Sequence, residues 1–330
     1  MPAVSVVIPL KNKGPHIACA LNSVLAQTFQ DFEIIVVDGS TDGGTEIVRE
    51  FADPRIRLIK EEKQGVSAAR NQGIAAARGE LIAFLDADDE WTPRHLETLL
   101  RLRENYPEAG AYGTARLTIM EDSTVLVSSY SDDIPPAPWE GLLPNYFRAA
   151  VRGTSPLLTS IVAVPKCILN EMGGFNTNAW FGEDADLWGR IALKYPVAFS
   201  WDGMGIYHED TSNRATNKKK PIREHVFVIS ARTALQAGEV PPELKEDFLE
   251  YVASRQIQIA YRNLEAGRPD LARDNLKGCK TRYLWKKYWA LLWAYIPSRI
   301  YLTLKPHRII KMLYNWNETI RCILAGKLRF

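Results

Sequence analysis

Cysteine is scarce in this sequence, and its placement argues against a disulfide framework. The four cysteines lie far apart in the chain, at Cys19, Cys167, Cys279 and Cys322. They show no metal-ligand spacing either, so a reducing compartment is expected. A basic and apolar leader is also lacking, because the apolar run at residues 4–10 is short and contains Pro9. These absences predict a cytoplasmic protein.

Long apolar runs and glycine-rich nucleotide motifs are missing as well. The apolar run at residues 288–296 ends at Pro297, which makes it too short to span a bilayer as a helix. No G-x-G-x-x-G motif follows the first apolar run, which argues against a dinucleotide-binding dehydrogenase. No G-x-x-x-x-G-K-[ST] motif is present, which argues against an ATPase.

The most informative stretch that is present covers residues 82–89, Ile-Ala-Phe-Leu-Asp-Ala-Asp-Asp. A short apolar run of this kind is typical of a buried strand. Carboxylates at the end of such a strand emerge where open α/β sheets bind ligands, and hard oxygen ligands suit Mg²⁺ or Mn²⁺ shared with substrate phosphates. The alternative is a strand followed by an acidic turn, because Asp favours turns.

Strands and helices are predicted to alternate before this stretch. Four apolar runs are separated by segments of helical spacing, at residues 4–10, 33–38, 55–60 and 81–86. This pattern indicates βαβ units, and hence an α/β fold with a parallel sheet. Polar groups follow each run, namely Asn12, Asp38, residues 65–71 and residues 86–89. Because parallel strands end at one edge, these groups are expected to share a cleft.

Four ordered motifs resemble glycosyltransferase family 2. They are Val-Val-Ile-Pro-x-x-Asn at residues 6–12, Val-Val-Asp-Gly-Ser-Thr-Asp at 36–42, Gly-x-x-x-Ala-Arg-Asn-x-Gly at 65–73 and Phe-Leu-Asp-Ala-Asp-Asp at 84–89. The resemblance covers residues 1–210 and implies the GT-A fold, a Rossmann-like, mostly parallel sheet flanked by helices, with inversion at the anomeric carbon. Lys13-Gly14 departs from the family, which commonly has an acidic residue after the first Asn.

The resemblance also implies roles for individual residues at the donor side of the site. It assigns donor-nucleotide binding to Pro9, Asn12, Asp38, Gly65, Arg70 and Asp86. Asp38 would accept a hydrogen bond from the uracil N–H. Asp86 and Asp88 would hold Mn²⁺ or Mg²⁺ against the diphosphate, and His208 would complete the metal shell. A lone His is more often a satisfied structural residue, so a structural role is the alternative for His208.

A second acidic cluster opens a predicted helix at residues 183–195. The plain explanation is that acids suit the positive end of the helix dipole. By the resemblance, Asp184 is instead the catalytic base, which an inverting displacement requires near the acceptor hydroxyl. The same resemblance places Glu183 beneath the sugar, with Asp186 in a supporting role. Gly174 would let the backbone approach the sugar or acceptor closely, and Trp188 would stack on a sugar ring, with core packing as its alternative. Residues 109–160 carry no motif.

The C-terminal part is predicted to be helical and differs in charge. The break at residues 217–221 suggests a catalytic domain at 1–215, a helical domain at 216–281 and a tail at 282–330, with helices at 223–237, 242–266 and 269–280. Residues 277–330 contain twelve Lys or Arg and one acid, a net charge of +11, which leaves −9 on residues 1–276.

Aromatic and basic residues alternate in the tail, which is typical of an amphipathic segment on an anionic membrane. The protein is therefore predicted to be peripheral at the inner face of the cell membrane. Packing on the protein or a contact within a homo-oligomer is the second interpretation. Nucleic acid is disfavoured, because no nucleic-acid-binding motif accompanies the basic residues.

The predicted function is a metal-dependent inverting glycosyltransferase. Its donor would be a nucleotide-sugar, most simply a UDP-sugar, and its acceptor a hydroxyl of a glycan or lipid-linked acceptor, as in cell-surface polysaccharide or glycolipid assembly. The alternatives are a sugar nucleotidyltransferase and a catalytically inactive membrane adaptor. Against a nucleotidyltransferase, the full Gly-rich signature expected after the first strand is not present. Against an inactive adaptor, such a protein would have no chemical need for Asp86, Asp88 and Asp184 together.

Overall fold

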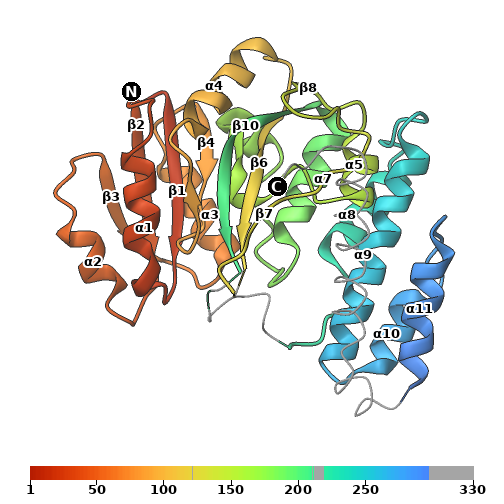
Figure 1. Ribbon diagram of the computed structural model, residues 1–330. Helices are drawn as coiled ribbons and strands as arrows, with labels where there is room; N and C mark the ends of the chain where they lie inside the picture. Colours follow the sequence, from red (N-terminus) through yellow and green to blue (C-terminus); the bar gives the residue numbers. More distant parts are fainter. Residues whose placement is uncertain (121, 210, 212–218, 297–330) are drawn as a thin grey trace.

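The computed structural model describes residues 1–120, 122–209, 211 and 219–296 (Figure 1). Its first part alternates strands and helices as predicted: β1 (Val4–Leu10), α1 (Gly14–Leu25), β2 (Phe32–Asp38), α2 (Gly44–Glu50), β3 (Ile56–Lys60), α3 (Val66–Ala76) and β4 (Leu81–Phe84). β1 pairs in parallel with β2 and β4, and β2 pairs in parallel with β3. The four carboxyl ends therefore lie along one rim, and the expected α/β fold is confirmed.

The second part of the chain adds both parallel and antiparallel strands to the sheet. It contains β5 (Glu90–Trp91), α4 (His95–Asn105), β6 (Ala111–Ile119), β7 (Val125–Val127), β8 (Glu140–Leu142), α5 (Tyr146–Arg152), the 3₁₀ turn η1 (Thr159–Ile161), β9 (Val162–Pro165), α6 (Lys166–Glu171), α7 (Glu183–Lys194) and β10 (Val197–His208). The strand order is β3-β2-β1-β4-β9-β6-β10-β5. β9 runs antiparallel to both β4 and β6, between which it lies.

Helices cover both faces of the sheet because its strands are apolar on both sides. On one face, Ile17 and Leu21 of α1 and Leu99 of α4 pack against alternate residues of β1, β2 and β4. On the other face, the remaining residues of these strands pack against α3, α5 and α7, with Trp188 of α7 fully buried. These two hydrophobic cores hold α1, α3 and α7 in place, and the polar groups near the first turns of these helices lie at the rim of the sheet.

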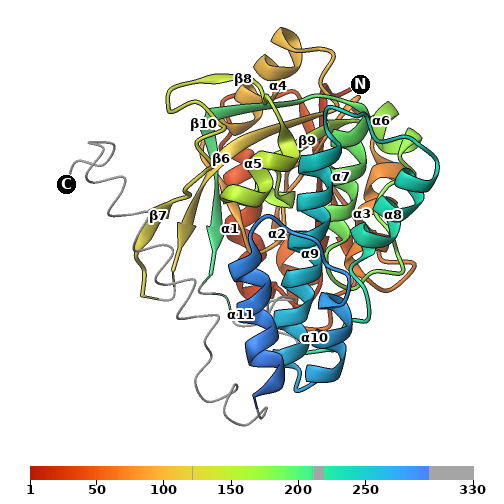
Figure 2. The ribbon, with the colours of Figure 1, turned by 90° about the vertical axis from the view of Figure 1, so that its right-hand side faces the viewer.

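Four further helices follow the sheet: α8 (Val226–Gln236), α9 (Lys245–Glu265), α10 (Pro269–Leu276) and α11 (Leu284–Tyr295). Figure 2 shows α9, α10 and α11 side by side. The first half of α9 packs through Phe248 and Tyr251 against Phe147 of α5 and Phe227 of α8. The ring contacts are edge-to-face except for the tilted pair Phe147–Tyr251. Its second half shares a small separate core with α10 and α11 that includes Trp293. Within the described ranges, no helix combines the length and apolar character needed to cross a membrane.

Candidate active site

The loops after β1 and β2 are tied together at the rim. Asn12 adopts a left-handed backbone conformation (φ 53°), and its Oδ1 accepts hydrogen bonds from the Thr41 N–H and hydroxyl at 2.9 and 3.2 Å. Asp38 accepts from the Ser40 N–H at 2.8 Å and from the Thr45 hydroxyl at 2.6 Å. Asn12 thus ties the loop after β2 to the loop after β1, and Asp38 organises the loop that follows its own strand. Contact with a nucleotide base stays a prediction for each of them.

The other two residues predicted to bind the nucleotide at this side have backbone roles. Pro9 lies in β1, where it is in register with Val37 of β2. Gly65 precedes α3 with a φ of 120°, which L-residues with a side chain rarely adopt. Its N–H donates to Glu61 Oε1 at 3.0 Å. A Cβ at Gly65 would meet no neighbouring atom, so its backbone conformation rather than close packing explains the glycine.

The three carboxylates after β4 have different environments. Asp86 and Asp88 are half-buried, whereas Asp89 is buried and accepts from the Ser160 hydroxyl at 2.5 Å and from the His208 N–H at 3.1 Å. Burial, together with the charges of Asp86 and Asp88, raises the pKa of Asp89 well above its ordinary value. Asp89 therefore braces the turn, and the other two carboxylates keep the more solvent-accessible positions.

Each of these two carboxylates is already paired with a cation of the chain. Lys13 Nζ lies 2.6 Å from Asp88 Oδ2, which also accepts from the Thr211 hydroxyl at 3.0 Å. Arg70 Nη2 lies 2.7 Å from Asp86 Oδ1. Lys13 and Thr211 were not predicted, because they are 75 and 123 residues away from Asp88 in sequence.

Arg70 connects the donor side of the site to α7. Its guanidinium, only 4% exposed, donates to Asp86 and also to Glu183 Oε1 at 2.9 Å. Burial lowers the pKa of Arg70, but the charges of Asp86 and Glu183 more than compensate and raise it above its ordinary value. Burial and the charge of Asp184 raise the pKa of Glu183, against the opposing effect of Arg70. The expected roles of Arg70 and Glu183 toward ligands stay predictions, but the two side chains do meet.

The predicted base stands at the start of α7. Gly182 precedes the helix in a left-handed conformation (φ 78°). Asp184 is half-buried and its Oδ1 accepts from the Ala185 N–H at 2.7 Å. Asp186 is buried and bonds Arg190 Nε at 2.9 Å and the Ser230 hydroxyl at 2.6 Å. The geometry gives Asp186 a structural function and leaves Asp184 as the more accessible carboxylate.

A glycine turn joins α3 to the segment before α7. Asn71 Nδ2 donates to the Phe175 carbonyl at 2.8 Å, and its Oδ1 accepts from the Phe175 N–H at 2.9 Å. Gly174 has a φ of 70°, and a Cβ there would lie 2.5 Å from Asn71 Oδ1. A glycine is therefore required for this close approach. The motif contained Asn71, but its partner lies 104 residues away in sequence.

Two further residues predicted to contact ligands, His208 and Trp188, are engaged by other side chains in the structure. His208 Nε2 lies 2.9 Å from Glu90 Oε1, so metal ligation, which stays a prediction, would use the other ring nitrogen or require release of that carboxylate. Trp188 is 1% exposed and packs against Phe84 and Phe175, with ring centroids 6.2 and 5.7 Å apart. Trp188 is therefore part of the hydrophobic core under α7, which agrees with the alternative of core packing.

The donor set after β4 fits a divalent cation that is shared with phosphates. In the part of the chain that the structure describes, no group of three or more His, Cys, Asp or Glu side chains is arranged to hold a metal. Mg²⁺ and Mn²⁺ sites of phosphate-transferring enzymes typically use one or two carboxylates and take the remaining ligands from substrate phosphates and water. Asp86 and Asp88 meet that requirement by chemistry and position.

Comparisons with known proteins identify a family and relatives that this chain resembles. Residues 5–149 match the model of the family described as glycosyl transferase family 2. The chain is 28% identical over 308 residues to an uncharacterized glycosyltransferase of Nostoc sp., covering 91% of this chain and 88% of that protein. It is 43% identical over 102 residues to the uncharacterized glycosyltransferase YibD of Escherichia coli, covering 30% of each chain.

Solved structures share the fold. Residues 1–349 of TarS from S. aureus in complex with UDP-GlcNAc superpose with a TM-score of 0.58 at 17% identity, over 82% of this chain and 87% of that one. The mannosyltransferase PcManGT from Pyrobaculum calidifontis, in complex with GDP-Man and Mn²⁺, gives 0.55 at 21% identity, over 96% and 87%. At these identities the likeness establishes the fold.

Proposed function

We propose that this chain, which is a glycosyltransferase with a family 2 domain, transfers a sugar from a UDP-sugar to a hydroxyl of a glycan or lipid-linked acceptor with inversion. The observation that carries the proposal is the bridge made by Arg70. It pairs with Asp86 at the end of β4 and with Glu183, the neighbour of Asp184, at the start of α7. If these roles hold, the bridge would keep the donor-side and acceptor-side carboxylates in one site.

The donor side of the site would bind the nucleotide diphosphate. Asp86 and Asp88 would hold Mn²⁺ or Mg²⁺, whose chemistry is to stabilise the charge on the departing diphosphate. Asp38 would select the uracil base. Support for a UDP donor comes from the TarS structure, which contains UDP-GlcNAc, whereas PcManGT contains GDP-Man and Mn²⁺. The choice between the two bases is therefore part of the test.

The acceptor side would supply the base. As the acceptor oxygen bonds to the anomeric carbon and the bond from that carbon to the phosphate oxygen breaks, Asp184 would take the proton of the acceptor hydroxyl. Glu183 and Asp186 would support this step indirectly, since both are engaged by arginines, Arg70 and Arg190. Assembly of a cell-surface polysaccharide or glycolipid would be the process served.

Replacement of the base tests this function. In Asp184→Asn, sugar transfer should fall by about 10²–10⁴-fold while UDP binding is retained, because the amide cannot accept the proton. Asp270→Asn is the matched control, since Asp270 is an exposed carboxylate of α10 paired with Arg268. Transfer at the wild-type rate in Asp184→Asn would show that the base is another group.

The exposed face of α11 supports the proposed contact with an anionic membrane. Its outward residues are large and apolar or aromatic: Leu284, Trp285, Tyr288, Trp289, Leu292 and Tyr295. Lys286 and Lys287 lie on the same helix, and residues 277–330 carry a net charge of +11. An aromatic face beside basic residues is complementary to an anionic lipid surface. Residues 297–330, the rest of the predicted tail, lie outside the described residues.

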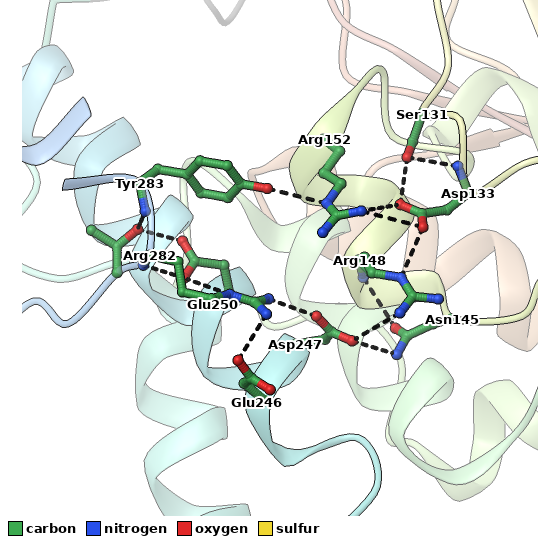
Figure 3. A network of polar contacts seen from close by, with 11 residues as sticks. Ser131, Asp133, Asn145, Arg148, Arg152, Glu246, Asp247, Glu250, Arg282 and Tyr283 are labelled. Atoms are coloured by element: carbon green, nitrogen blue, oxygen red, sulfur yellow. Dashed lines mark hydrogen bonds and ion pairs between the residues drawn. The ribbon is translucent and has the colours of Figure 1, made fainter. Parts of the chain in front are cut away.

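A polar network fastens the segment before α11 to the catalytic part (Figure 3). Arg282 bonds Glu246 at 2.8 Å and Asp247 at 2.7 Å, both on α9. Arg152 of α5 donates to the Tyr283 hydroxyl at 3.1 Å. The aromatic face of α11 is thus held in a fixed orientation relative to the catalytic part. A membrane bound there would present lipid-linked acceptors to an enzyme of fixed orientation.

Vesicle binding tests the membrane contact. Co-sedimentation with anionic phosphatidylglycerol vesicles should be lost in Trp285→Ser/Tyr288→Ser and retained in Val125→Ser/Val127→Ser, which removes exposed apolar residues from β7 instead. Equal sedimentation of both variants would contradict the proposal. If the protein is a dimer in the absence of vesicles, and only Trp285→Ser/Tyr288→Ser makes it a monomer, the exposed face of α11 is instead a contact between copies of the chain.

A further inference from the structure

Lys13 occupies an unusual position for a lysine. Its ammonium lies 2.6 Å from Asp88 Oδ2, and the two side chains are only 12% and 16% exposed. The backbone at Lys13 is fixed as well, because its carbonyl accepts from the N–H groups of His16 and Ile17 at 2.9 and 3.0 Å. The chain therefore places a positive charge directly on a carboxylate that is proposed to bind a metal.

Lys13 differs from the other cation of this site. Arg70 is held by two carboxylates, Asp86 and Glu183, and is almost fully buried. Among the described residues, Asp88 is the one carboxylate paired with Lys13. A lysine side chain has a flexible four-carbon stem and a compact charge that bonds phosphate well. Lys13 is thus the cation that can exchange partners while Arg70 stays in place.

We infer that Lys13 is a built-in counter-ion that makes divalent-cation binding at Asp88 depend on the donor's diphosphate. This inference rests on the proposed function, because it takes the diphosphate to bind beside Asp86 and Asp88. Without nucleotide, the ammonium occupies Asp88 and repels a second cation. With nucleotide, Lys13 moves to a diphosphate oxygen and Asp88 becomes available. Cation and nucleotide then bind cooperatively, and each strengthens the other by the same factor.

Binding measurements on Lys13→Met test this coupling without measuring activity. Mn²⁺ affinity is measured by electron paramagnetic resonance with and without saturating UDP, and the ratio of the two dissociation constants is the coupling factor. In Lys13→Met, nucleotide-free Mn²⁺ binding should tighten about tenfold and the coupling factor should fall about tenfold. Lys13→Arg, which keeps the charge, should retain most of the coupling. Lys194→Met is the control, because Lys194 pairs with Glu171 on the surface.

The outcomes separate this inference from the proposed function. An unchanged coupling factor in a folded Lys13→Met protein that still binds UDP would overturn the inference and leave the proposed function standing. Absence of UDP binding by the wild-type protein, with or without Mn²⁺, would overturn both. Loss of the added Mn²⁺ affinity in Lys13→Met/Asp88→Asn is expected, and its persistence would place the cation elsewhere and contradict the inference.

Discussion

The two parts of the sheet differ in how they are built. The strands β3, β2, β1 and β4 are parallel and are joined by local βαβ connections. Beyond β4, the antiparallel β9 separates β4 from β6, and pairing partners come from distant parts of the chain. The first part supplies Asp86 and Asp88, and the second supplies Glu183 and Asp184. The site therefore lies where the two parts meet, and contacts across that boundary hold it together.

The largest effect is expected from breaking the main contact across the boundary. Arg70→Met leaves Asp86 and the buried Glu183 without their shared cation, which should lower the free energy of unfolding by about 3–5 kcal/mol. Urea unfolding followed by circular dichroism measures this. Arg49→Met removes an exposed pair with Glu46 and should change little. Equal stability of the two variants would show that Arg70 does not join the two parts.

A smaller loss of stability is expected when the pH is lowered, through a buried histidine beside α7. His225 is buried beside Gly182 at the start of α7, and burial, with the nearby charge of Arg255, lowers its pKa to about 3. As pH falls, the imidazole of His225 is therefore protonated in the unfolded chain before it is protonated in the folded chain. The stabilisation from neutral His225 is fully present above pH 6.5 and is lost as pH falls from 6.5 toward 3. The contribution lost between about pH 7 and pH 5 is about 2 kcal/mol.

Urea unfolding at a series of pH values checks this expectation. In His225→Asn, which keeps an acceptor for the Phe227 N–H, the free energy of unfolding should depend less steeply on pH just below 6.5. An unchanged slope would assign the acid sensitivity to other groups.

The smallest effect is expected at the second contact across the boundary. Asn71→Ala removes both hydrogen bonds to the Phe175 backbone and should cost about 1–2 kcal/mol. Thermal unfolding compared with Asn178→Ala, an exposed asparagine of the same segment, measures the difference. Identical midpoints would mean that the glycine turn is held by other contacts.

The comparison also explains what the sequence could predict. Each motif of the parallel part lies within one βα connection, so the strands, their order of appearance and the rim carboxylates followed from local patterns. The position of β9 did not, because no local pattern shows that this four-residue strand inserts antiparallel between β4 and β6. Nor did the pairs Lys13–Asp88 and Arg70–Glu183, which are separated by 75 and 113 residues. Only folding reveals such partners.

The most direct test of the account is a calorimetric titration of the protein with UDP and GDP, with and without Mn²⁺. The account predicts Mn²⁺-dependent binding of UDP that Asp86→Ala abolishes, because Asp86 would hold the cation against the diphosphate. Nucleotide binding that neither Mn²⁺ nor Asp86→Ala affects would contradict it.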